Sequence, residues 1–360
     1  MSATDPAPDV TVVTVTYDAA RLVRTCLDSL ARQRLGGLRM EVVVVDNASH
    51  DETPDVVAEE YPDVRLVRAP RNLGFAAGNN LALRAVRSRY AVLLNNDAVA
   101  DPDAVRALVE AMDAAADDVA AMAATVLLAA RFRAAGPGEL EAPDAVRGPD
   151  GVWLPDPAGD VRLVNSTGNQ VRADGFGEDR GWLADASRHH PARDVFGFTG
   201  AAAVLRMSAL RDVGLFDEAL FMYYEDTDLS WRGRSRGWRY RYVPDARVRH
   251  IHAASTGEGS PVFQHYVERN RLLMLVKNAP ARMAAAAVLR YVLTTASYAR
   301  RDVVAPVLGL HRPRPTVVIR RVRSFVDFLR LLPATLGERR RIRRAATVGD
   351  DELLAWAVRR

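Results

Sequence analysis

Short apolar runs alternate with amphipathic segments through the first third of the chain. The run at residues 10–16 is β-branched and almost continuous, and similar runs occupy 41–45, 64–68 and 90–94. Such runs are typical of parallel strands that are buried on both faces. Residues 22–30, between the first two runs, carry apolar side chains at helical spacing. This alternation predicts an α/β fold with a doubly wound sheet and right-handed crossovers.

Capping and turn residues indicate where the next helices begin. Ser49 and Glu52 have the spacing of a capping box, in which the Ser49 hydroxyl accepts from the backbone N–H of Glu52. Residues 72–89 are expected to form a turn that leads into a helix. Residues 101–115 begin with Asp-Pro, a combination that favours a helix start. One helix is therefore expected after each of the second, third and fourth strands.

The second half of the chain has shorter elements. Residues 131–160 are rich in Gly, Pro and Ala and are expected to form a variable loop, whereas 161–182 alternate β-like pieces with Gly. A strand is expected at 198–206, and helices at 208–213 and 265–277. The stretch between these two helices carries the most concentrated candidate chemistry.

Three acidic residues in that stretch follow an aromatic run and open a helix. They are Glu225, Asp226 and Asp228, and a short strand at 240–243 then leads towards His250. Acids in a first helical turn have a structural explanation, because each is stabilised by the helix dipole by ~0.3–1 kcal/mol. The functional interpretation is a general base and a metal ligand held in one cluster.

Acidic residues also stand at the ends of the predicted strands. Asp18, Asp46 and Asp97 each come at or just past the carboxyl end of an apolar run. In open α/β sheets, ligands bind along that edge. Three acids on one edge therefore predict a ligand site there.

The composition of the chain indicates a cellular compartment. Hydrophobic residues make up 49% of the chain and charged residues 26%, as in ordinary soluble proteins. Cys26 is the single cysteine, which fits a reducing cytoplasm. The first residues lack the basic and apolar regions of a signal peptide. The longest apolar stretch, 283–299, is interrupted by Arg290 and does not resemble a membrane span.

Positive charge is concentrated at the C-terminal end. Residues 311–360 hold 13 arginines and 5 acidic residues, a net charge of +8. Arginines flank an apolar segment, a pattern typical of helices that lie on anionic membranes, although a solvated helical extension is the structural alternative. Nucleic acid is not an expected partner, because Phe325 and Phe328 fall on one helical face and do not suit base stacking. Deleting 311–360 is expected to release the protein from membranes.

Seven motifs occur in one order between residues 10 and 277. They are VVTVTY at 12–17, VVDNASHDET at 44–53, NLGFAAGNN at 72–80, LLNND at 93–97, GLFDEALFMYYEDTDL at 214–229, PDARVRH at 244–250 and ERNRL at 268–272. In this combination the chain resembles a family 2 glycosyltransferase of the GT-A fold, a doubly wound, Rossmann-like mixed sheet. The nearest subgroup is that of bacterial rhamnosyltransferases of cell-wall and O-antigen assembly. The resemblance implies a GT-A domain at 1–277 and a helical, Arg-rich extension at 278–360.

A nucleotide-diphosphate sugar is the donor that this resemblance implies. Asp46 would accept from the pyrimidine N–H and Tyr17 would lie against the base, whereas an Asx turn is the structural alternative for Asp46. The other residues implied on the donor side are Thr16, Asp18, Asn72, Gly74, Asn80, Asn96, Asp97, Arg232 and Arg269. Of these, Asn72 and Asn80 are expected to shape the donor loop. The two arginines are either diphosphate ligands or solvated side chains.

The resemblance also implies a divalent metal, Mg²⁺ or Mn²⁺, that bridges the diphosphate. Asp97, Asn95 and His250 are the implied metal residues. This chain has Asn-Asn-Asp where the wider family has Asp-x-Asp, so one carboxylate is missing. Asp226 would be the general base for an inverting transfer, with Glu225 as the alternative base.

The implied acceptor is a polysaccharide or a polyprenyl-linked saccharide at the cytoplasmic face of the plasma membrane, and the implied donor is dTDP-L-rhamnose. Two alternatives stay open. One is the same fold with another donor, such as a UDP-hexose. The other is a nucleotide-sugar binding protein without catalytic activity.

Overall fold

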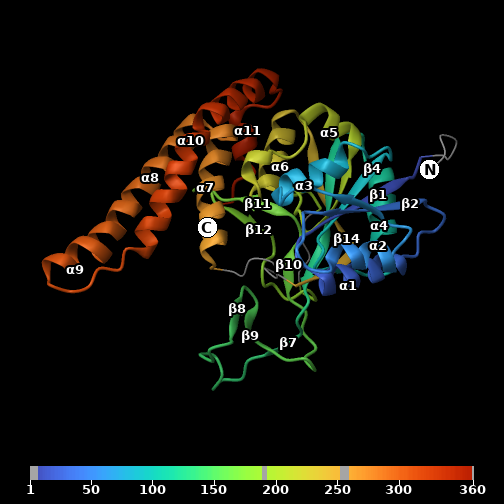
Figure 1. The fold of residues 1–360 in the computed structure, drawn as a ribbon, viewed down its shortest axis with the longest axis horizontal. Coiled ribbons are helices and arrows are strands. Elements are labelled where there is room, and N and C mark those ends of the chain that lie inside the picture. The colour runs from blue at the N-terminus through green and yellow to red at the C-terminus, as the bar shows by residue number, and fades with distance from the viewer. Residues whose placement is uncertain (1–6, 189–192, 252–258, 359–360) are drawn as a thin grey trace.

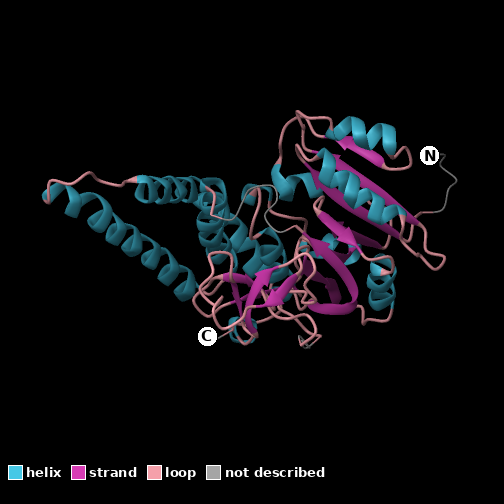
Figure 2. Ribbon diagram, turned by 90° about the horizontal axis from the view of Figure 1, so that it is seen from below, coloured by secondary structure: helices cyan, strands magenta, loops and turns pink. Residues whose placement is uncertain are grey.

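A computed structural model describes residues 7–188, 193–251 and 259–358 of the chain (Figure 1). Residues 1–6, part of the segment considered above for a signal peptide, lie outside the described residues. A mixed sheet with helices on both faces forms the body, and a helical hairpin projects from it. A small three-stranded sheet, separate from the main one, lies at the bottom of Figure 1, and Figure 2 distinguishes strands from helices by colour.

The main sheet has the strand order β3-β2-β1-β4-β13-β6-β14-β5, with β10 paired to β6. The strands are β1 (Val10–Thr16), β2 (Met40–Asp46), β3 (Arg65–Arg68), β4 (Tyr90–Leu94), β5 (Ala98–Ala100), β6 (Val119–Leu128), β10 (Val164–Ser166), β13 (Ala202–Arg206) and β14 (Arg239–His250). Strands β1 to β4 pair in parallel, and β14 pairs in parallel with β6. Strand β13 runs antiparallel to both β4 and β6. The carboxyl ends of β1, β2, β4 and β14 therefore meet the beginning of β13 at one edge.

Helices cover both faces of this sheet. On one face α1 (Ala20–Ala31), α2 (Thr53–Glu60) and α4 (Ala104–Asp113) pack on a core that includes Val12, Val44 and Val92. On the other face α3 (Gly74–Leu83), α5 (Met207–Val213) and α6 (Glu225–Ser235) pack on Val13, Val43 and Leu93. Successive residues of each strand thus point into opposite cores, one on each face of the sheet, which confirms the doubly wound α/β fold.

Several local predictions were wrong. The capping box does not form: the Ser49 hydroxyl accepts from the backbone N–H of Asp18, and Asp51 instead accepts from the N–H of Thr53. Helix α3 begins within the expected turn and ends at Leu83. The expected loop at 131–160 contains β7 (Phe132–Ala134), β8 (Val146–Gly148) and β9 (Gly151–Pro155), which pack around Trp153.

The C-terminal third consists of α7 (Pro261–Asn278), α8 (Ala281–Ala299), the π-helical η2 (Arg300–Val304), α9 (Ala305–Leu308), α10 (Thr316–Ala345) and α11 (Asp350–Leu354). Two small elements, β11 (Asn169–Val171) and β12 (Gly177–Asp179), form a hairpin beside α6. Val358 forms a β-bridge with Arg172 of this hairpin region. Among the described residues, no helix has both the length and the apolar character needed to cross a bilayer.

One hydrophobic cluster spans the division that the sequence suggested at residue 277. It joins Trp231 of α6 and Leu272 of α7 to Tyr291 of α8, Phe328 of α10 and Leu353 of α11. The two-domain division stays a prediction, and the helical extension shares a core with the sheet-containing part.

Candidate active site

The edge where the parallel strands end brings distant segments into contact. The backbone N–H of Asn95, just past β4, donates to the carbonyl of Ala201 at 3.0 Å. The neighbouring Gly200 donates its N–H to Oδ2 of Asp226 at the start of α6, also at 3.0 Å. Two backbone residues before β13 thus connect the Asn-Asn-Asp segment with the acidic helix start. The predicted metal residues and the predicted base lie on one rim.

Asp97 and His250 form a buried pair on this rim. Oδ1 of Asp97 lies 3.0 Å from Nε2 of His250, and the two residues are only 6% and 7% exposed. Nδ1 of His250 faces the amide oxygen of Asn165 at 2.7 Å, so Nδ1 is the nitrogen that carries the proton. Nε2 is then an acceptor, and the Asn95 amide lies 3.2 Å from it.

This geometry leaves an acceptor without a donor. Oδ1 of Asp97 is buried and makes no hydrogen bond, although it lies beside Nε2 of His250. A carboxylate oxygen and an imidazole lone pair that face each other fit a cation, and the hydrogen bond from Nδ1 orients the ring as for a metal ligand. The described residues contain no group of three or more His, Cys, Asp or Glu side chains that could hold a metal ion. Among the described residues the candidate ligands of this kind are thus the pair Asp97 and His250, which suits an ion that binds mainly through substrate phosphates.

Asp226 and Glu225 differ in environment although they are adjacent. Asp226 is partly exposed and accepts from the N–H groups of Gly200 and Thr227. Burial raises the pKa of Asp226, while these hydrogen bonds oppose the rise. Glu225 is 6% exposed, and its Oε2 has no hydrogen-bond partner. Burial, followed by repulsion from Asp226, holds the pKa of Glu225 well above its usual range. Asp226 is therefore the carboxylate that is available at the rim.

The segment just before α6 has a strained backbone. Phe221, Tyr223 and Tyr224 have φ angles of 66°, 69° and 71°, a left-handed conformation that side chains with a Cβ rarely adopt. Such residues cost about 1–3 kcal/mol each and persist only where their surroundings hold them. They cluster at functional sites, and here they directly precede the acidic pair.

Two residues of α7 hold this segment. Asn270 is fully buried, and its amide nitrogen donates to the carbonyls of Leu220, Met222 and Tyr223 at 2.7–2.9 Å. Arg269 donates through Nη2 to the carbonyl of Leu220 at 3.0 Å, and its Nε donates to Asn270. Arg269 was predicted on the donor side, but the structure places it among these backbone contacts.

Arg232 needs the same correction. It is 5% exposed, and its Nε donates to Asp228 at 2.9 Å. Its Nη1 and Nη2 donate to the carbonyls of Val213 and Leu215. Lys277 lies 2.8 Å from the same Asp228. Burial alone would raise the pKa of Asp228, but the Lys277 and Arg232 cations outweigh burial and lower it. Both arginines and the third acid of the motif therefore stabilise the position of α6.

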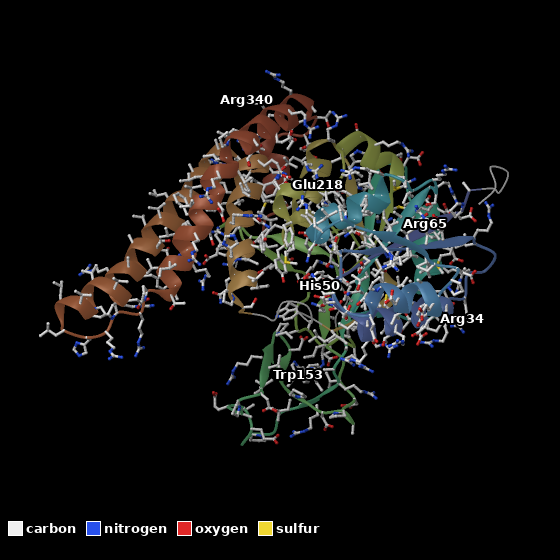
Figure 3. All side chains as sticks on the ribbon, viewed as in Figure 1. Arg34, His50, Arg65, Trp153, Glu218 and Arg340 are labelled. Atoms are coloured by element: carbon white, nitrogen blue, oxygen red, sulfur yellow. The ribbon has the colours of Figure 1, made fainter. Side chains whose placement is uncertain are left out.

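The ends of β1 and β2 carry the residues predicted to contact the nucleotide. Asp46 is 3% exposed, and its Oδ2 lies 3.3 Å from the Ser49 N–H, three residues on, whereas an Asx turn would use the N–H two residues on. Tyr17 is 38% exposed and packs edge-on against His50, which is labelled in Figure 3. Asp18 accepts from the His50 N–H at 2.6 Å, the main cause of its lowered pKa. The exposed ring of Tyr17 and the buried carboxylate of Asp46 thus come from the ends of the adjacent strands β1 and β2.

Thr16 and Asn96 join the end of β1 to the end of β4. The Asn96 amide donates to the Thr16 hydroxyl at 3.1 Å, and both residues are buried. These two predicted donor-side residues therefore fix the spacing of the strand ends.

The loop that enters α3 approaches the strained segment closely. Gly74 has a φ of 76°, and a Cβ at this position would lie 2.5 Å from the Phe221 ring. Oδ1 of Asn72 accepts from the Gly74 N–H at 2.9 Å. Only glycine fits here, so this turn and residues 221–224, which precede Asp226, are positioned together.

Asn80 lies further along α3 and is 1% exposed. Its amide donates to the Phe216 carbonyl at 2.9 Å and to Glu218, which is labelled in Figure 3, and its oxygen accepts from the Phe216 N–H. Asn80 shapes the loop and does not face the rim.

Sequence reasoning missed Asn165, Asn270 and Gly200. Asn270 lies within the ERNRL motif, which could have drawn attention to it beside Arg269. Gly200 allows a close backbone approach, because a Cβ there would lie 3.0 Å from the Phe75 ring. Asn165 gave no signal, because it lies in β10, a three-residue strand among the short β-like pieces of residues 161–182.

A cavity of about 1020 Å³ lies elsewhere, between β6, β9 and β14. Its lining includes Thr125, Trp153, Tyr242 and Arg247, and none of the predicted site residues. We place the candidate site at the rim, because the unsatisfied Asp97 oxygen, the acidic pair and the strained backbone all lie there.

Several known proteins resemble this chain in sequence. A family model described as Glycosyl transferase family 2 matches residues 11–132, and another, described as Glycosyl transferase family group 2, matches 178–300. The chain is 31% identical over 263 residues to the N-acetylglucosaminyl-diphospho-decaprenol L-rhamnosyltransferase of Mycobacterium tuberculosis, covering 68% of this chain and 77% of that protein. It is 38% identical over 119 residues to the succinoglycan biosynthesis protein ExoO of Rhizobium meliloti, covering 33% of this chain and 34% of that one.

A solved structure has the same fold. The crystal structure of GalNAc-T7 with UDP, GalNAc and Mn²⁺ superposes with a TM-score of 0.54 at 14% identity. The match covers 75% of this chain and 48% of GalNAc-T7, so this chain spans about half of that protein.

Proposed function

This chain is a member of the family 2 glycosyltransferases and has their GT-A fold, and from that premise we propose that it transfers L-rhamnose from dTDP-L-rhamnose to a polyprenyl-diphosphate-linked saccharide. The observation that carries the proposal is the rim, where the Asp97–His250 pair connects to Asp226 through Asn95, Ala201 and Gly200. The M. tuberculosis relative, whose name specifies a rhamnosyl transfer to a diphospho-decaprenol acceptor, supports the choice of donor and acceptor.

Asp97 and His250 would hold a divalent cation, Mg²⁺ or Mn²⁺. The buried Asp97 oxygen without a hydrogen bond and the acceptor nitrogen of His250 fit a cation. When bound, the ion neutralises the charge of the departing diphosphate. The Asn95 amide nitrogen lies 3.2 Å from Nε2 of His250, so this residue would help to orient the imidazole.

Asp226 would take the proton from the acceptor hydroxyl as that oxygen attacks the anomeric carbon. Its pKa is raised by burial, which makes the carboxylate a stronger base, and Gly200 and Thr227 fix its orientation. A positioned general base contributes about 10²–10⁴-fold to the rate. Attack opposite the leaving diphosphate inverts the configuration in one step. Burial and repulsion from Asp226 raise the pKa of Glu225 and disfavour its charged form, so it is the weaker candidate for this role.

The donor nucleotide would lie along the ends of β1 and β2. Tyr17 offers an exposed ring for the base, and Asp46 offers a buried carboxylate for the pyrimidine N–H. The Gly74 turn packs directly against Phe221, so the loop that enters α3 is fixed beside the segment that precedes Asp226. The protein would act at the cytoplasmic face of the plasma membrane, where polyprenyl-linked acceptors are accessible.

Thermal-shift measurements against a panel of nucleotide sugars, with and without Mn²⁺, test the donor. Stabilisation follows RT ln(1 + [L]/Kd), so the cognate donor gives a shift that its relatives do not. We expect dTDP-L-rhamnose to give the largest shift, and a larger shift from a UDP-hexose would replace the donor assignment.

Asp226→Asn tests catalysis itself. The expected result is loss of transfer by about 10²–10⁴-fold with donor binding retained. Full transfer by this variant would contradict the assigned base, and absence of transfer in the wild type with donor binding retained would indicate a binding protein.

A further inference from the structure

The projecting hairpin ends in an apolar tip. Helices α8 and α10 both project away from the sheet and contact each other, and α9 forms the point farthest from it (Figures 1 and 2). At this point Val304, Val307, Leu308 and Leu310 are 50%, 53%, 80% and 97% exposed. Leucines this exposed on a soluble protein indicate a surface that is covered by a partner.

Apolar side chains continue from the tip along the outside of the hairpin. On α10, Ile319, Val322, Val326 and Leu329 recur at intervals of three and four residues, and each is 39–47% exposed. The opposite side of the hairpin is already packed, because Tyr291 stacks on Phe325 at 5.8 Å. The exposed stripe is therefore an additional apolar face.

Positive charge surrounds the tip. Between residues 300 and 314 the chain has four arginines and one acid, Asp302, which pairs with Arg301. The side chains of Arg300, Arg312 and Arg314 are exposed. Two copies of the chain joined through this face would bring like charges together, whereas an anionic lipid surface complements them.

The backbone of the tip is suited to a shallow position among lipid headgroups. The N–H groups of Gly309, Leu310, His311 and Arg314 all donate to carbonyls within the tip. Because these donors are satisfied, the turn can leave bulk water at little cost. No described helix can span a bilayer, so the contact is interfacial.

The arginines that first indicated a membrane contact are partly used for packing. Arg339 donates to the carbonyls of Val276 and Ala279 at 2.7 Å, and Arg343 donates to Ala279 at 3.0 Å. Arg321 is buried against Glu268. Deleting 311–360 would remove Phe328 and Leu353 from the shared core, so that deletion is not a clean test of membrane contact.

We propose that the α8–α10 hairpin inserts its tip, Val304 to Leu310, into the headgroup region of an anionic bilayer. This inference rests on the proposed function in one respect, since a polyprenyl-linked acceptor explains why the enzyme needs the membrane. The tip provides apolar anchoring, and the surrounding arginines pair with lipid phosphates.

Co-sedimentation of the full chain with vesicles tests this proposal. The vesicles contain phosphatidylcholine and phosphatidylglycerol in a two-to-one ratio, and pure phosphatidylcholine vesicles serve for comparison. The double variant Leu308→Glu with Leu310→Glu is expected to lower partitioning by about tenfold or more, because each buried leucine contributes at least that much. Leu140→Glu is the matched control, because Leu140 is 41% exposed on the distant 131–160 segment, and it should bind as the wild type does.

A second double variant tests how much the arginines beside the tip contribute to vesicle binding. Arg312→Gln with Arg314→Gln is expected to weaken binding to the anionic vesicles by about tenfold and to leave pure phosphatidylcholine binding unchanged. Equal thermal unfolding of all variants shows that the fold is retained. If the glutamates unfold the tip, Leu310→Gly removes the same side chain at a residue whose φ of 58° suits glycine.

Wild-type protein that stays in the supernatant, or a tip variant that sediments like the wild type, would refute the proposal. So would a dimer in sedimentation velocity that the tip variant abolishes, because that outcome assigns the face to a second copy. Transfer to a soluble, short-chain acceptor is measured in parallel. It should be unchanged in the tip variants, and its absence in the wild type would count against the proposed function without affecting the vesicle result.

Discussion

Asn270→Ala is the perturbation that most directly probes how the acidic helix start is held. The two amide hydrogens of Asn270 are shared among the carbonyls of Leu220, Met222 and Tyr223 in a fully buried position. Each intramolecular hydrogen bond contributes about 0.5–1.5 kcal/mol, and buried carbonyls left without donors cost more. We therefore expect the free energy of unfolding to fall by about 2–4 kcal/mol.

The effect on the rate should exceed what this loss of stability alone would produce. Without Asn270, the left-handed residues Phe221, Tyr223 and Tyr224 can relax, and each relaxation recovers about 1–3 kcal/mol. This relaxation of the backbone limits the loss of stability. It also moves Asp226, which is two residues after Tyr224. A displacement of about 1 Å at a reacting group lowers a rate by about 10²-fold, so kcat should fall by that factor.

Urea unfolding and kcat at saturating donor measure the two effects. Leu27→Ala is the matched control, because Leu27 is 2% exposed in the core on the opposite face of the sheet. That variant should lose about 2–5 kcal/mol of stability and keep its kcat. The reasoning is refuted if Asn270→Ala loses stability but retains its kcat, or if both variants lose kcat equally.

Two further predictions concern the charges of the rim. Glu225→Gln should raise the melting temperature by a few degrees at neutral pH and give no gain near about pH 4, the usual range of a glutamate pKa. The raised pKa of Glu225 makes its contribution to stability decrease as pH rises, and a pH-independent gain in thermal unfolding would contradict this. Asn165→Ala should weaken Mn²⁺ binding by about 10–100-fold in calorimetry with donor present, because the His250 ring loses its orienting partner. His250→Ala should weaken it further, and unchanged Mn²⁺ affinity in both variants would exclude this pair as the metal site.

Elements that depend on local pattern could be predicted from the sequence. The strand expected at residues 90–94 is β4 with the same bounds, and the run at 10–16 is β1. Because strand direction follows from the alternation of strands and helices, the shared edge of Asp46 and Asp97 could be predicted as well. The pairing of Asp97 with His250 follows from that edge, since β14 runs parallel to β6 and ends there.

Side-chain partners could not be predicted in the same way. The Ser49–Glu52 spacing allowed a capping box, but the end of β1 lies close enough for Asp18 to use the Ser49 hydroxyl instead. The Arg232 position allowed a diphosphate contact, but Asp228 and two carbonyls are nearer. In both cases a tertiary neighbour competes with the local partner, and a single sequence does not reveal that neighbour.

The arginines of the C-terminal third show why charge alone was an incomplete guide to the membrane contact. Arg339 binds the last carbonyls of α7, and Arg343 pairs with Asp350, so these cations serve the fold. Their net charge is indistinguishable in sequence from that of Arg312 and Arg314, which remain exposed at the tip. Apolar neighbours distinguish Arg312 and Arg314 from the arginines that serve the fold. Leu310 beside them is 97% exposed, which is unfavourable in water but favourable at a bilayer interface. The proposed membrane-contacting surface is therefore better located by its apolar side chains, and the neighbouring arginines would then specify which lipids it meets.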